Sequence, residues 1–414
     1  MKVLAISHGL WYSGAQVSTL EFLEMLSQKV DIRIITCKNG NREFINNLKL
    51  VGPVYEVPCR KDLGYPAMHV EEVKPLVREI DLVWLTDVEF LAAPRIKRIR
   101  RDVPVVAHLH SYALICPWWG ALYGFRGVCT ERCSAWRNTR CKQGINLELA
   151  KVGLLSESRA SLYWLLDFAK GPVDFAKWRL LMKNVVRSID GFIAVSNNLW
   201  DIHLKHLPEL KGKPHVVVYN PALTPFKYVN VNDDEPYGDY VLYASGPNLV
   251  KGPHILLDAW KMIEKEVSGV ELVMTGCKGT WVEGRVKSLG VGNVRCLGRV
   301  PEQQYYELMY RARALVLPSL WPEPFSLVPL EANRLGVPAI ISDRNGVREV
   351  FTDGVNGRIW PCCRAEALAE VIRDVVTRSW KREAIRRSID NILDPVTISN
   401  KIIEFFTHVA SIAK

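Results

Sequence analysis

Short apolar runs alternate with longer amphipathic stretches from one end of the chain to the other. Each run is four or five residues long, which is typical of a strand buried on both faces, and the stretches between the runs repeat apolar residues at helical spacing. This alternation favours parallel sheets covered by helices on both faces. Strands are predicted at residues 3–7, 32–36, 82–86, 105–108, 191–195, 216–219, 240–244, 271–275, 314–318 and 339–342. Helices are predicted between most of them, among others at residues 15–27, 254–265, 303–311 and 327–335.

A chain of 414 residues exceeds what one hydrophobic core usually holds, and the alternation of strands and helices occurs twice. We therefore predict the α/β fold class with two doubly wound, Rossmann-like domains. The boundary is expected in a stretch rich in turn-forming residues at 220–236. The expected parts are a first domain at residues 1–222 with an insertion at about 111–187, a second domain at 223–395, and a C-terminal helix at 396–414 that packs back toward the first domain.

The net charge of +10 is concentrated in the first half of the chain. Residues 1–222 carry 30 Lys and Arg against 21 Asp and Glu, and residues 91–187 carry 17 against 6, whereas the chain after residue 222 carries 24 against 23. This asymmetry predicts that the first domain meets an anionic surface or substrate. The N-terminus becomes polar too early for a signal peptide, and no run of 18 apolar residues occurs, so we expect a cytoplasmic protein.

Two glutamates, Glu323 and Glu331, stand on either side of a predicted helix start. Glu323 lies between two prolines and should be extended, because a residue that precedes proline avoids the helical region. Ser326 is a good N-cap, and Gly336 should end the helix. One carboxylate thus lies before the helix and one about a turn inside it, beside amides that attract anions. Carboxylates can accept hydrogen bonds from sugar and ribose hydroxyls, and the nearby amides can bind phosphate, so this arrangement suits a nucleotide-sugar. The alternative is two glutamates on a solvated helix.

Ligands of doubly wound sheets bind at the carboxyl ends of the strands, so the loops that follow the predicted strands are candidate ligand contacts. Small residues at 13–14 follow the first strand and let backbone amides approach a phosphate, although the G-x-G-x-x-G fingerprint of dinucleotide binding is absent. Ser245 and Gly246 follow another strand. Lys251 stands shortly after them, before a glycine at a helix start. It is a candidate cation for a phosphate, and the alternative is a solvated lysine.

With these motifs the chain resembles glycosyltransferase family 4, whose GT-B architecture consists of two facing Rossmann-like domains. The resemblance covers essentially the whole chain and is most specific in its second half. It rests on the pattern Glu323-x7-Glu331, on Lys251-Gly252, on Ala194-Val195-Ser196-Asn197, on Asn220-Pro221, on Gly346-x-x-Glu349 and on the turn Asp353-Gly354-Val355-Asn356-Gly357.

The resemblance implies a role for each matching residue. Glu331 should hold the ribose hydroxyls, Glu323 should contact hydroxyls of the donor sugar, and Lys251 should neutralise the leaving diphosphate. Gly14 should let the first loop close over that diphosphate, and His110 matches the histidine that such enzymes place near the anomeric carbon. The predicted catalytic residues are His110, Lys251 and Glu323, and the predicted donor-binding residues are Gly14, Ser245, Gly246, Lys251, Arg299, Phe325, Ser326, Leu327 and Glu331.

The implied function is retaining transfer of a sugar from a UDP- or GDP-sugar to a glycan or lipid-linked acceptor. No D-x-D pair dominates the chain, so no metal cofactor is expected to be required for catalysis. The family usually has an arginine before the Lys-Gly element, where Pro247 and Asn248 stand here. Either Arg299 supplies the second cation, or the alternative function applies, which is a catalytically impaired subunit that binds sugar nucleotides as a scaffold. An inverting enzyme would instead need a base near the first loop, for which His8 is the candidate.

Four of the ten cysteines lie in the predicted insertion with the spacing C-x12-C-x3-C-x7-C. Cys116, Cys129, Cys133 and Cys141 are a candidate structural zinc site. Because paired C-x2-C knuckles are lacking, disulfides and free thiols are the alternatives. Basic residues surround these cysteines, so a zinc module that binds nucleic acid is a further alternative. That alternative does not explain the second domain, and no nucleic-acid partner is expected.

Residues 160–185 mix apolar side chains such as Trp164, Leu165 and Phe168 with lysines and arginines. This composition fits a pair of helices that faces the core. The alternative is a basic, aromatic surface that lies on anionic lipid at the cytoplasmic face of a membrane, which would suit a lipid-phosphate-linked acceptor.

Overall fold

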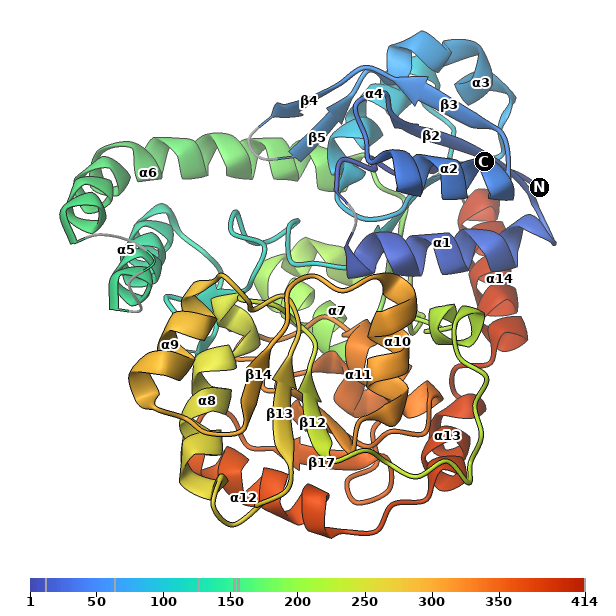
Figure 1. Cartoon of the computed structure of the whole chain (residues 1–414). Helices are drawn as coiled ribbons and strands as arrows, with labels where there is room; N and C mark the ends of the chain where they lie inside the picture. Colours follow the sequence, from blue (N-terminus) through green and yellow to red (C-terminus); the bar gives the residue numbers. More distant parts are fainter. Residues whose placement is uncertain (12, 63–64, 126, 152–153, 155–156, 413–414) are drawn as a thin grey trace.

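The structure is a computed structural model, and it describes the chain except residues 12, 63–64, 126, 152–153, 155–156 and 413–414. Tyr12, in the predicted small-residue loop, therefore lies outside the described residues. Two α/β domains lie one above the other in Figure 1, and each is built on a parallel sheet. This confirms the prediction of two facing Rossmann-like domains.

The N-terminal domain contains a seven-stranded sheet in the order β11-β10-β7-β6-β1-β2-β3, in which every neighbouring pair is parallel. The strands are β1 (Lys2–Ile6), β2 (Asp31–Cys37), β3 (Val54–Val57), β6 (Leu82–Leu85), β7 (Val105–Leu109), β10 (Gly191–Ala194) and β11 (His215–Val217). The helices around this sheet are α1 (Gly14–Ser27), α2 (Arg42–Val51), α3 (Lys74–Glu79), α4 (Ala92–Ile99) and α7 (Asn197–His206). The central strands are buried along their whole length, as expected for a sheet covered on both faces.

The C-terminal domain contains a six-stranded parallel sheet in the order β14-β13-β12-β15-β16-β17. Within the domain this is the strand order 3-2-1-4-5-6 of dinucleotide-binding folds. The strands are β12 (Tyr240–Tyr243), β13 (Glu271–Met274), β14 (Val294–Cys296), β15 (Ala314–Leu317), β16 (Ala339–Ser342) and β17 (Gly357–Trp360). The helices are α8 (Pro253–Ile263), α9 (Trp281–Leu289), α10 (Glu302–Arg311), α11 (Leu327–Arg334), α12 (Ala365–Thr377) and α13 (Arg382–Asp390).

All ten predicted strands are present, within two residues of their predicted ends. The strands that the sequence pattern missed are β3, β14 and β17, each at an edge of its sheet, the small hairpin of β4 (Cys59–Asp62) and β5 (Tyr65–Met68), and the two-residue strands β8 (Leu122–Tyr123) and β9 (Gly127–Val128). An edge strand is half exposed and lacks the continuous apolar run of a central strand, so its pattern is weak. The hairpin is joined to β2 by a disulfide between Cys37 and Cys59, a pair outside the predicted cysteine cluster.

The last helix, α14 (Pro395–Ile412), leaves the C-terminal domain and packs on the N-terminal domain beside α1 (Figure 1). Its apolar face belongs to the same buried cluster as strands β1 and β6, and the ring of Phe406 lies 5.8 Å from that of Trp84. Lys29, in the turn after α1, donates a hydrogen bond to Asn400 over 2.7 Å. The C-terminal helix thus joins the two domains physically.

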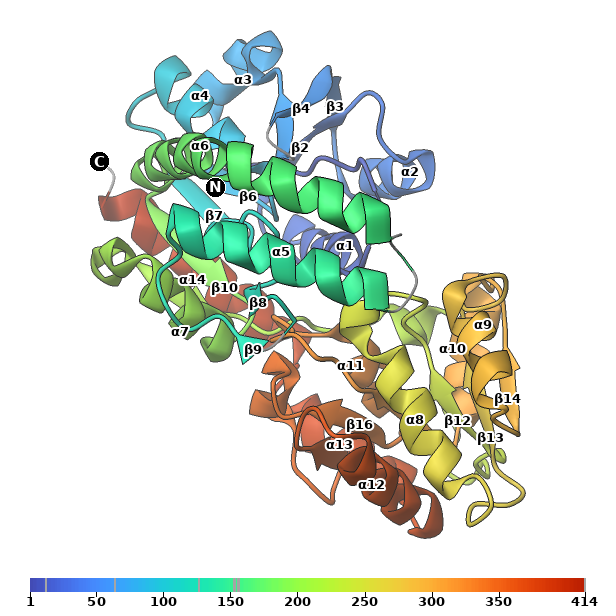
Figure 2. The ribbon, with the colours of Figure 1, turned by 90° about the vertical axis from the view of Figure 1, so that its left-hand side faces the viewer.

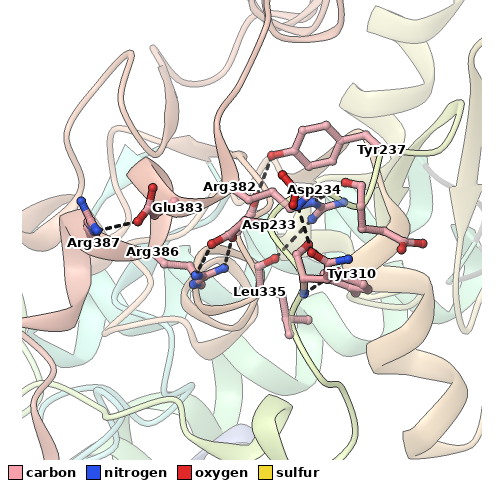
Figure 3. Close-up of polar contacts among 12 residues, drawn as sticks. Asp233, Asp234, Tyr237, Tyr310, Leu335, Arg382, Glu383, Arg386 and Arg387 are labelled. Carbon is pink, nitrogen blue, oxygen red and sulfur yellow. Dashed lines mark hydrogen bonds and ion pairs between the residues drawn. The ribbon is translucent and has the colours of Figure 1, made fainter.

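The chain segment that enters the C-terminal domain is fixed to α13 (Figure 3). Arg386 forms an ion pair with Asp233, and Arg382 Nε donates a hydrogen bond to the carbonyl oxygen of Glu235 over 2.9 Å. The guanidinium of Arg382 also lies over the ring of Tyr237, whose hydroxyl donates to the carbonyl oxygen of Gly336 over 2.7 Å. These contacts hold the segment before β12 against the end of α11, the helix that carries the second predicted glutamate.

Between β7 and β10 the chain forms the short strands β8 (Leu122–Tyr123) and β9 (Gly127–Val128) and the helices α5 (Ala135–Lys151) and α6 (Glu157–Arg187). Figures 1 and 2 show that α5 and α6 run side by side as a hairpin that projects from the N-terminal domain. The second half of α6 packs on that domain through Phe175, Trp178 and Met182, and Trp178 Nε1 donates to the hydroxyl of Tyr65 over 2.9 Å. The side chains of Trp164, Leu165 and Phe168 lie outside the described residues.

Candidate functional site

A deep cleft opens between the two domains, at the carboxyl ends of both sheets. It has two connected parts of about 570 and 800 Å³ that share the wall formed by the start of α1, the loop after β12 and the start of α11. The first part also contains His110, Lys251 and Glu323, and the second contains Arg299 and Glu331. The cleft therefore brings together predicted site residues that are separated by more than two hundred positions in the sequence.

Lys251 and Glu323 form an ion pair on the C-terminal side of the cleft. Lys251 Nζ lies 2.5 Å from Glu323 Oε1, and Ser319 Oγ donates to the same oxygen over 2.6 Å. The Glu323 side chain is only 4% exposed, while Lys251 is 23% exposed and lies over the ring of Trp321. Glu323 is irregular rather than helical, as its position between two prolines predicts. The pair places one cation where a ligand in the cleft can reach it.

Lys251 ends a short 3-10 turn, Leu249–Lys251, and Gly252 after it adopts a left-handed conformation with φ +73°. Asn248, which stands near the position of the family's arginine, caps this turn by accepting a hydrogen bond from the amide of Val250. A Cβ at Gly252 would lie 2.0 Å from the carbonyl oxygen of Pro318. The Lys-Gly element is thus explained by geometry, because only glycine fits both the backbone conformation and the close approach of the loop after β15.

Replacing Gly252 by alanine should therefore lower the free energy of unfolding by about 2–4 kcal/mol, since left-handed strain adds to a steric overlap. Urea unfolding measures this change. Gly290→Ala is the matched control, because Gly290 also has a left-handed φ of +56° but has open space around its Cβ position. The control should lose only about 1 kcal/mol. Equal losses in the two variants would show that the Pro318 contact is unimportant.

Glu331 lies in the second turn of α11 and is buried at the other end of the cleft, with 4% of its surface exposed. Tyr306 of α10 donates a hydrogen bond to Glu331 Oε1 over 3.0 Å, and Tyr306 stacks on Tyr228. Burial, followed by the nearby Glu21 carboxylate, raises the pKa of Glu331 to about 8. The protein thus holds a carboxyl group in a place where solvent cannot stabilise its charge.

The remaining predicted donor contacts lie along the same walls. Ser326 takes the N-cap position of α11, but its side chain makes no capping hydrogen bond, so the sequence rule identified the position and not the interaction. Gly14 at the start of α1 approaches this helix, because a Cβ there would lie 3.8 Å from Leu327 Cδ1. The predicted donor-binding residues that line the cleft are Gly14, Ser245, Gly246, Lys251, Arg299, Phe325, Ser326, Leu327 and Glu331.

The N-terminal wall of the first part of the cleft carries His110, directly after β7. Its Nε2 atom is buried and has no hydrogen-bond partner among the described residues. Burial lowers the pKa of His110 to about 3, so the ring is neutral at pH 7. A neutral imidazole with a free nitrogen can form a hydrogen bond with a bound hydroxyl but does not add positive charge.

Asp87 is a cleft residue that the sequence patterns did not identify. It follows β6, lines the same part of the cleft as His110, and is 5% exposed, with Oδ1 lacking a partner in the described structure. Burial and the neighbouring Glu89 raise the pKa of Asp87 well above its usual range. The sequence could have indicated Asp87 as a cleft residue only by its position directly after a predicted strand, because ligands bind at the carboxyl ends of parallel strands.

His8 does not fit the role of a catalytic base, which the inverting alternative requires. Its side chain is fully buried and is not part of the cleft wall. Nδ1 lies 2.9 Å from the Leu10 amide, and Nε2 lies 3.1 Å from Gln16 Nε2, so both ring nitrogens have a partner. Burial lowers its pKa to about 3.

Residues of three family-like motifs fix one domain to the other, although Val195 and Asn220 from these motifs also line the cleft. Ser196 Oγ donates to the carbonyl oxygen of Pro324 over 2.6 Å, and Asn220 Nδ2 donates to the carbonyl oxygen of Phe325 over 3.1 Å. Glu349 accepts hydrogen bonds from the amides of Asn197 and Asn198 at the start of α7. These contacts, which we call the interdomain clasp, hold the loop that carries Glu323 against the N-terminal domain.

Cys116, Cys129, Cys133 and Cys141 line one small buried cavity together with His206. All four are free thiols, and Cys141 Sγ accepts a hydrogen bond from the Gly124 amide over 3.3 Å. Within the described part of the chain, no group of three His, Cys, Asp or Glu side chains is arranged to hold a metal ion. The insertion thus gathers the predicted cysteines without forming a ready metal centre, and structural zinc stays a prediction that elemental analysis of the protein would test.

Two family descriptions match this chain. Residues 12–222, just over half of the chain, match Glycosyltransferase Family 4, and residues 230–391 match Glycosyl transferases group 1. Among curated relatives, spore coat protein SA of Bacillus subtilis is 31% identical over 157 residues, 35% of this chain and 41% of that protein. Phosphatidyl-myo-inositol mannosyltransferase of Mycobacterium leprae is 30% identical over 134 residues, 32% of this chain and 36% of that protein. These matches span well under two thirds of the relatives' length.

Solved structures show the same two-domain architecture over nearly the entire chain. The crystal structure of Anabaena Alr3699/HepE in complex with UDP-glucose has a TM-score of 0.66 at 19% identity and covers 99% of this chain and 100% of that one. The lipopolysaccharide outer core galactosyltransferase WaaB has a TM-score of 0.62 at 14% identity, with 99% of each chain covered. Identities this low establish the fold alone. Because the family match itself extends over more than half of the sequence, the protein belongs to glycosyltransferase family 4, with the GT-B fold.

Proposed function

We propose that the protein transfers a sugar from a nucleotide-sugar, a UDP- or GDP-sugar, to a glycan or lipid-linked acceptor, with retention of the anomeric configuration. The observation that carries the proposal is the continuous cleft with Glu331 at one end and the Lys251–Glu323 pair at the other. A nucleotide-sugar has the matching sequence of groups, which are ribose hydroxyls, two phosphates and sugar hydroxyls.

In this proposal each wall of the cleft meets one part of the donor. Glu331 accepts hydrogen bonds from the ribose hydroxyls. The diphosphate lies between Lys251, Arg299 and the amides at the start of α11, where the helix dipole favours negative charge. The donor sugar reaches Glu323. Two of the similar proteins support a nucleotide-sugar donor. One is a phosphatidyl-myo-inositol mannosyltransferase, and one is a crystal structure in complex with UDP-glucose.

The chemical step separates a sugar with oxocarbenium character from a nucleoside diphosphate. Positive charge aimed at the departing phosphate oxygens stabilises that separation most strongly in a site from which water is excluded. Lys251 is in position to supply this charge once it exchanges Glu323 for the phosphate. The Glu323 carboxylate then faces the sugar that develops positive charge, so the Lys251–Glu323 ion pair becomes two separate contacts with the donor.

The acceptor is proposed to enter along the N-terminal wall, which carries Asp87, His110 and two aromatic side chains, Trp11 and Trp119. Aromatic faces commonly support sugar rings through apolar contact, and Asp87 Oδ1 and His110 Nε2 are free to accept or donate hydrogen bonds to hydroxyls. The acceptor hydroxyl would thus be held beside the anomeric carbon without a strong base.

A thermal-shift screen across nucleotide-sugars tests the proposal directly. A ligand at 100 times its Kd adds about 2.7 kcal/mol of stability, which shifts the melting temperature by several degrees. We expect one nucleotide-sugar class to give such a shift and slow release of its nucleoside diphosphate. A shift without any nucleotide release would instead favour the scaffold alternative, which the missing arginine near Asn248 motivates. No shift with any nucleotide-sugar would contradict both.

A further inference from the structure

Helix α6 presents a continuous exposed stripe along most of its length. The residues of the stripe recur every three or four positions, which places them on one side of the helix. At 1.5 Å per residue the stripe is about 40 Å long. This basic–apolar stripe consists of Leu162, Leu166, Lys170, Val173, Lys177, Leu180, Asn184 and Arg187, all of them exposed.

The stripe faces away from the rest of the protein. Phe175, Trp178 and Met182 on the opposite side of α6 are buried in the N-terminal domain, so the helix cannot turn its stripe inward. In Figure 1 α5 lies on the side of the C-terminal domain and α6 lies beyond it, and Figure 2 shows the two helices side by side. The stripe therefore remains uncovered while both domains keep their contacts.

The chemistry of the stripe is unusual for a surface that meets only water. Leu180 is 72% exposed, Val173 is 55% exposed and Leu162 is 53% exposed. Cations alternate with these apolar side chains, and none of the eight positions is acidic, although Asp174 is exposed on the flank. Helices that lie in the headgroup region of an anionic bilayer have this arrangement. Their apolar side chains enter the bilayer together with the aliphatic parts of lysine and arginine, whose charged ends stay in the headgroup region.

A shallow hollow lies at the C-terminal end of the same stripe. Three cations surround two leucines there, and the hollow is lined by Lys177, Leu180, Leu181, Lys183, Asn184 and Arg187. A phosphate group bound by the cations would bring its attached acyl chains onto the leucines. Residues 131–187 of the insertion carry 11 Lys and Arg against 5 Asp and Glu. The electrostatic potential of the insertion is therefore positive, like that of the hollow, and attracts anionic lipid.

We propose that the basic–apolar stripe of α6 docks the protein on the surface of an anionic phospholipid bilayer, with the helix in the plane of the interface. Within the described chain, each helix is too short or too polar to cross a bilayer, so the contact is with one membrane surface only. A nucleic acid would pair with the cations but leave the leucines in water, which makes lipid the better partner. The proposal does not depend on the transfer reaction, because it concerns a surface outside the cleft.

Flotation with vesicles tests this docking. The intact protein should float with vesicles of phosphatidylcholine mixed with phosphatidylglycerol, should not float with phosphatidylcholine alone, and should be released by high salt. Lys177→Glu together with Arg187→Glu should weaken vesicle binding at least about tenfold, because two attractive charges become repulsive. Leu180→Ser should weaken it several-fold at unchanged charge.

Matched controls separate the stripe from general charge and general hydrophobicity. Lys265→Glu with Lys381→Glu makes the same charge change on exposed residues of the C-terminal domain, and Leu50→Ser removes a leucine that is 86% exposed on α2. Neither control should alter flotation, and all variants should melt at the same temperature. Equal flotation of stripe and control variants, or flotation on neutral vesicles alone, overturns the proposal. Binding to a labelled RNA oligonucleotide in place of vesicles would assign the stripe to nucleic acid and overturn it as well.

Discussion

Replacing Lys251 by methionine is expected to lower the rate of sugar transfer roughly 100- to 1000-fold, the usual cost of removing one group that stabilises transition-state charge. Methionine keeps the length of the side chain and removes its charge, so the departing diphosphate loses its nearest cation. Steady-state kinetics with the donor identified by the thermal-shift screen measure the loss. The decrease should appear mainly in kcat, because the charge on the diphosphate grows as the sugar leaves.

The same substitution should also destabilise the empty enzyme, which calls for a control. Lys251→Met leaves the buried Glu323 carboxylate without its partner, and breaking a buried ion pair from one side costs about 3–5 kcal/mol. Lys251→Met combined with Glu323→Gln removes both charges and should regain most of that stability. Transfer should remain lost in the double variant. Recovery of transfer together with stability would show that Lys251 supports the fold and not the chemistry.

The preferences of proline, glycine and helix-capping residues were sufficient to predict the backbone around Glu323 and the ends of α11. Glu323 before Pro324 is extended, α11 begins at Leu327, and Gly336 ends it with φ +71°, all as the proline and cap positions predict. The ten predicted strands followed from their apolar runs, and nine of them lie inside their sheets, whereas β11 is an edge strand. Edge strands β3, β14 and β17 were missed because exposed edges do not need such runs.

Contacts between distant segments could not be predicted from spacing. The Lys251–Glu323 pair joins residues 72 positions apart, and only the parallel arrangement of β12 and β15 puts their following loops side by side. Asp87 carried no motif. The resemblance included Glu349 in a motif, but its contacts became visible only in the structure, where Glu349 accepts hydrogen bonds from two backbone amides of α7 across the domain boundary.

The interdomain clasp gives several motif residues a role in holding the two domains together. A Cβ at Gly346 would lie 2.0 Å from the carbonyl oxygen of Pro324, so this glycine lets the loop after β16 sit directly behind the loop that carries Glu323. Ser196 and Asn220 bind the same loop from the N-terminal domain. The loop that carries Glu323 is thus fixed from both domains, which would orient the carboxylate for its proposed contact with the donor sugar.

Replacing Glu331 by glutamine should weaken donor binding about 10- to 100-fold, since hydrogen bonds between hydroxyls and a carboxylate contribute about 1.5–3 kcal/mol. At the same time it should stabilise the empty protein at alkaline pH. The pKa of Glu331 is about 8 in the folded protein, against an ordinary value of 4.5 for a solvated glutamate. Between these two pH values the folded state therefore holds a proton that the unfolded state has lost. Stability from this group is therefore complete below pH 4.5 and is lost as the pH rises toward 8.

Urea unfolding of both proteins between pH 5 and 9 measures this difference. The free energy of unfolding of the wild type should fall between pH 5 and 9. Glu331→Gln has no titrating group at position 331, so its free energy of unfolding should fall less. Above pH 8 the variant should be more stable than the wild type by up to a few kcal/mol. Glu89, whose pKa burial raises to about 7, contributes a similar slope to both proteins and cancels in the comparison. A variant that loses both donor binding and alkaline stability would contradict this account. Loss of binding together with a gain of stability would show that a buried carboxyl group is maintained against its own solvation cost because the donor requires it.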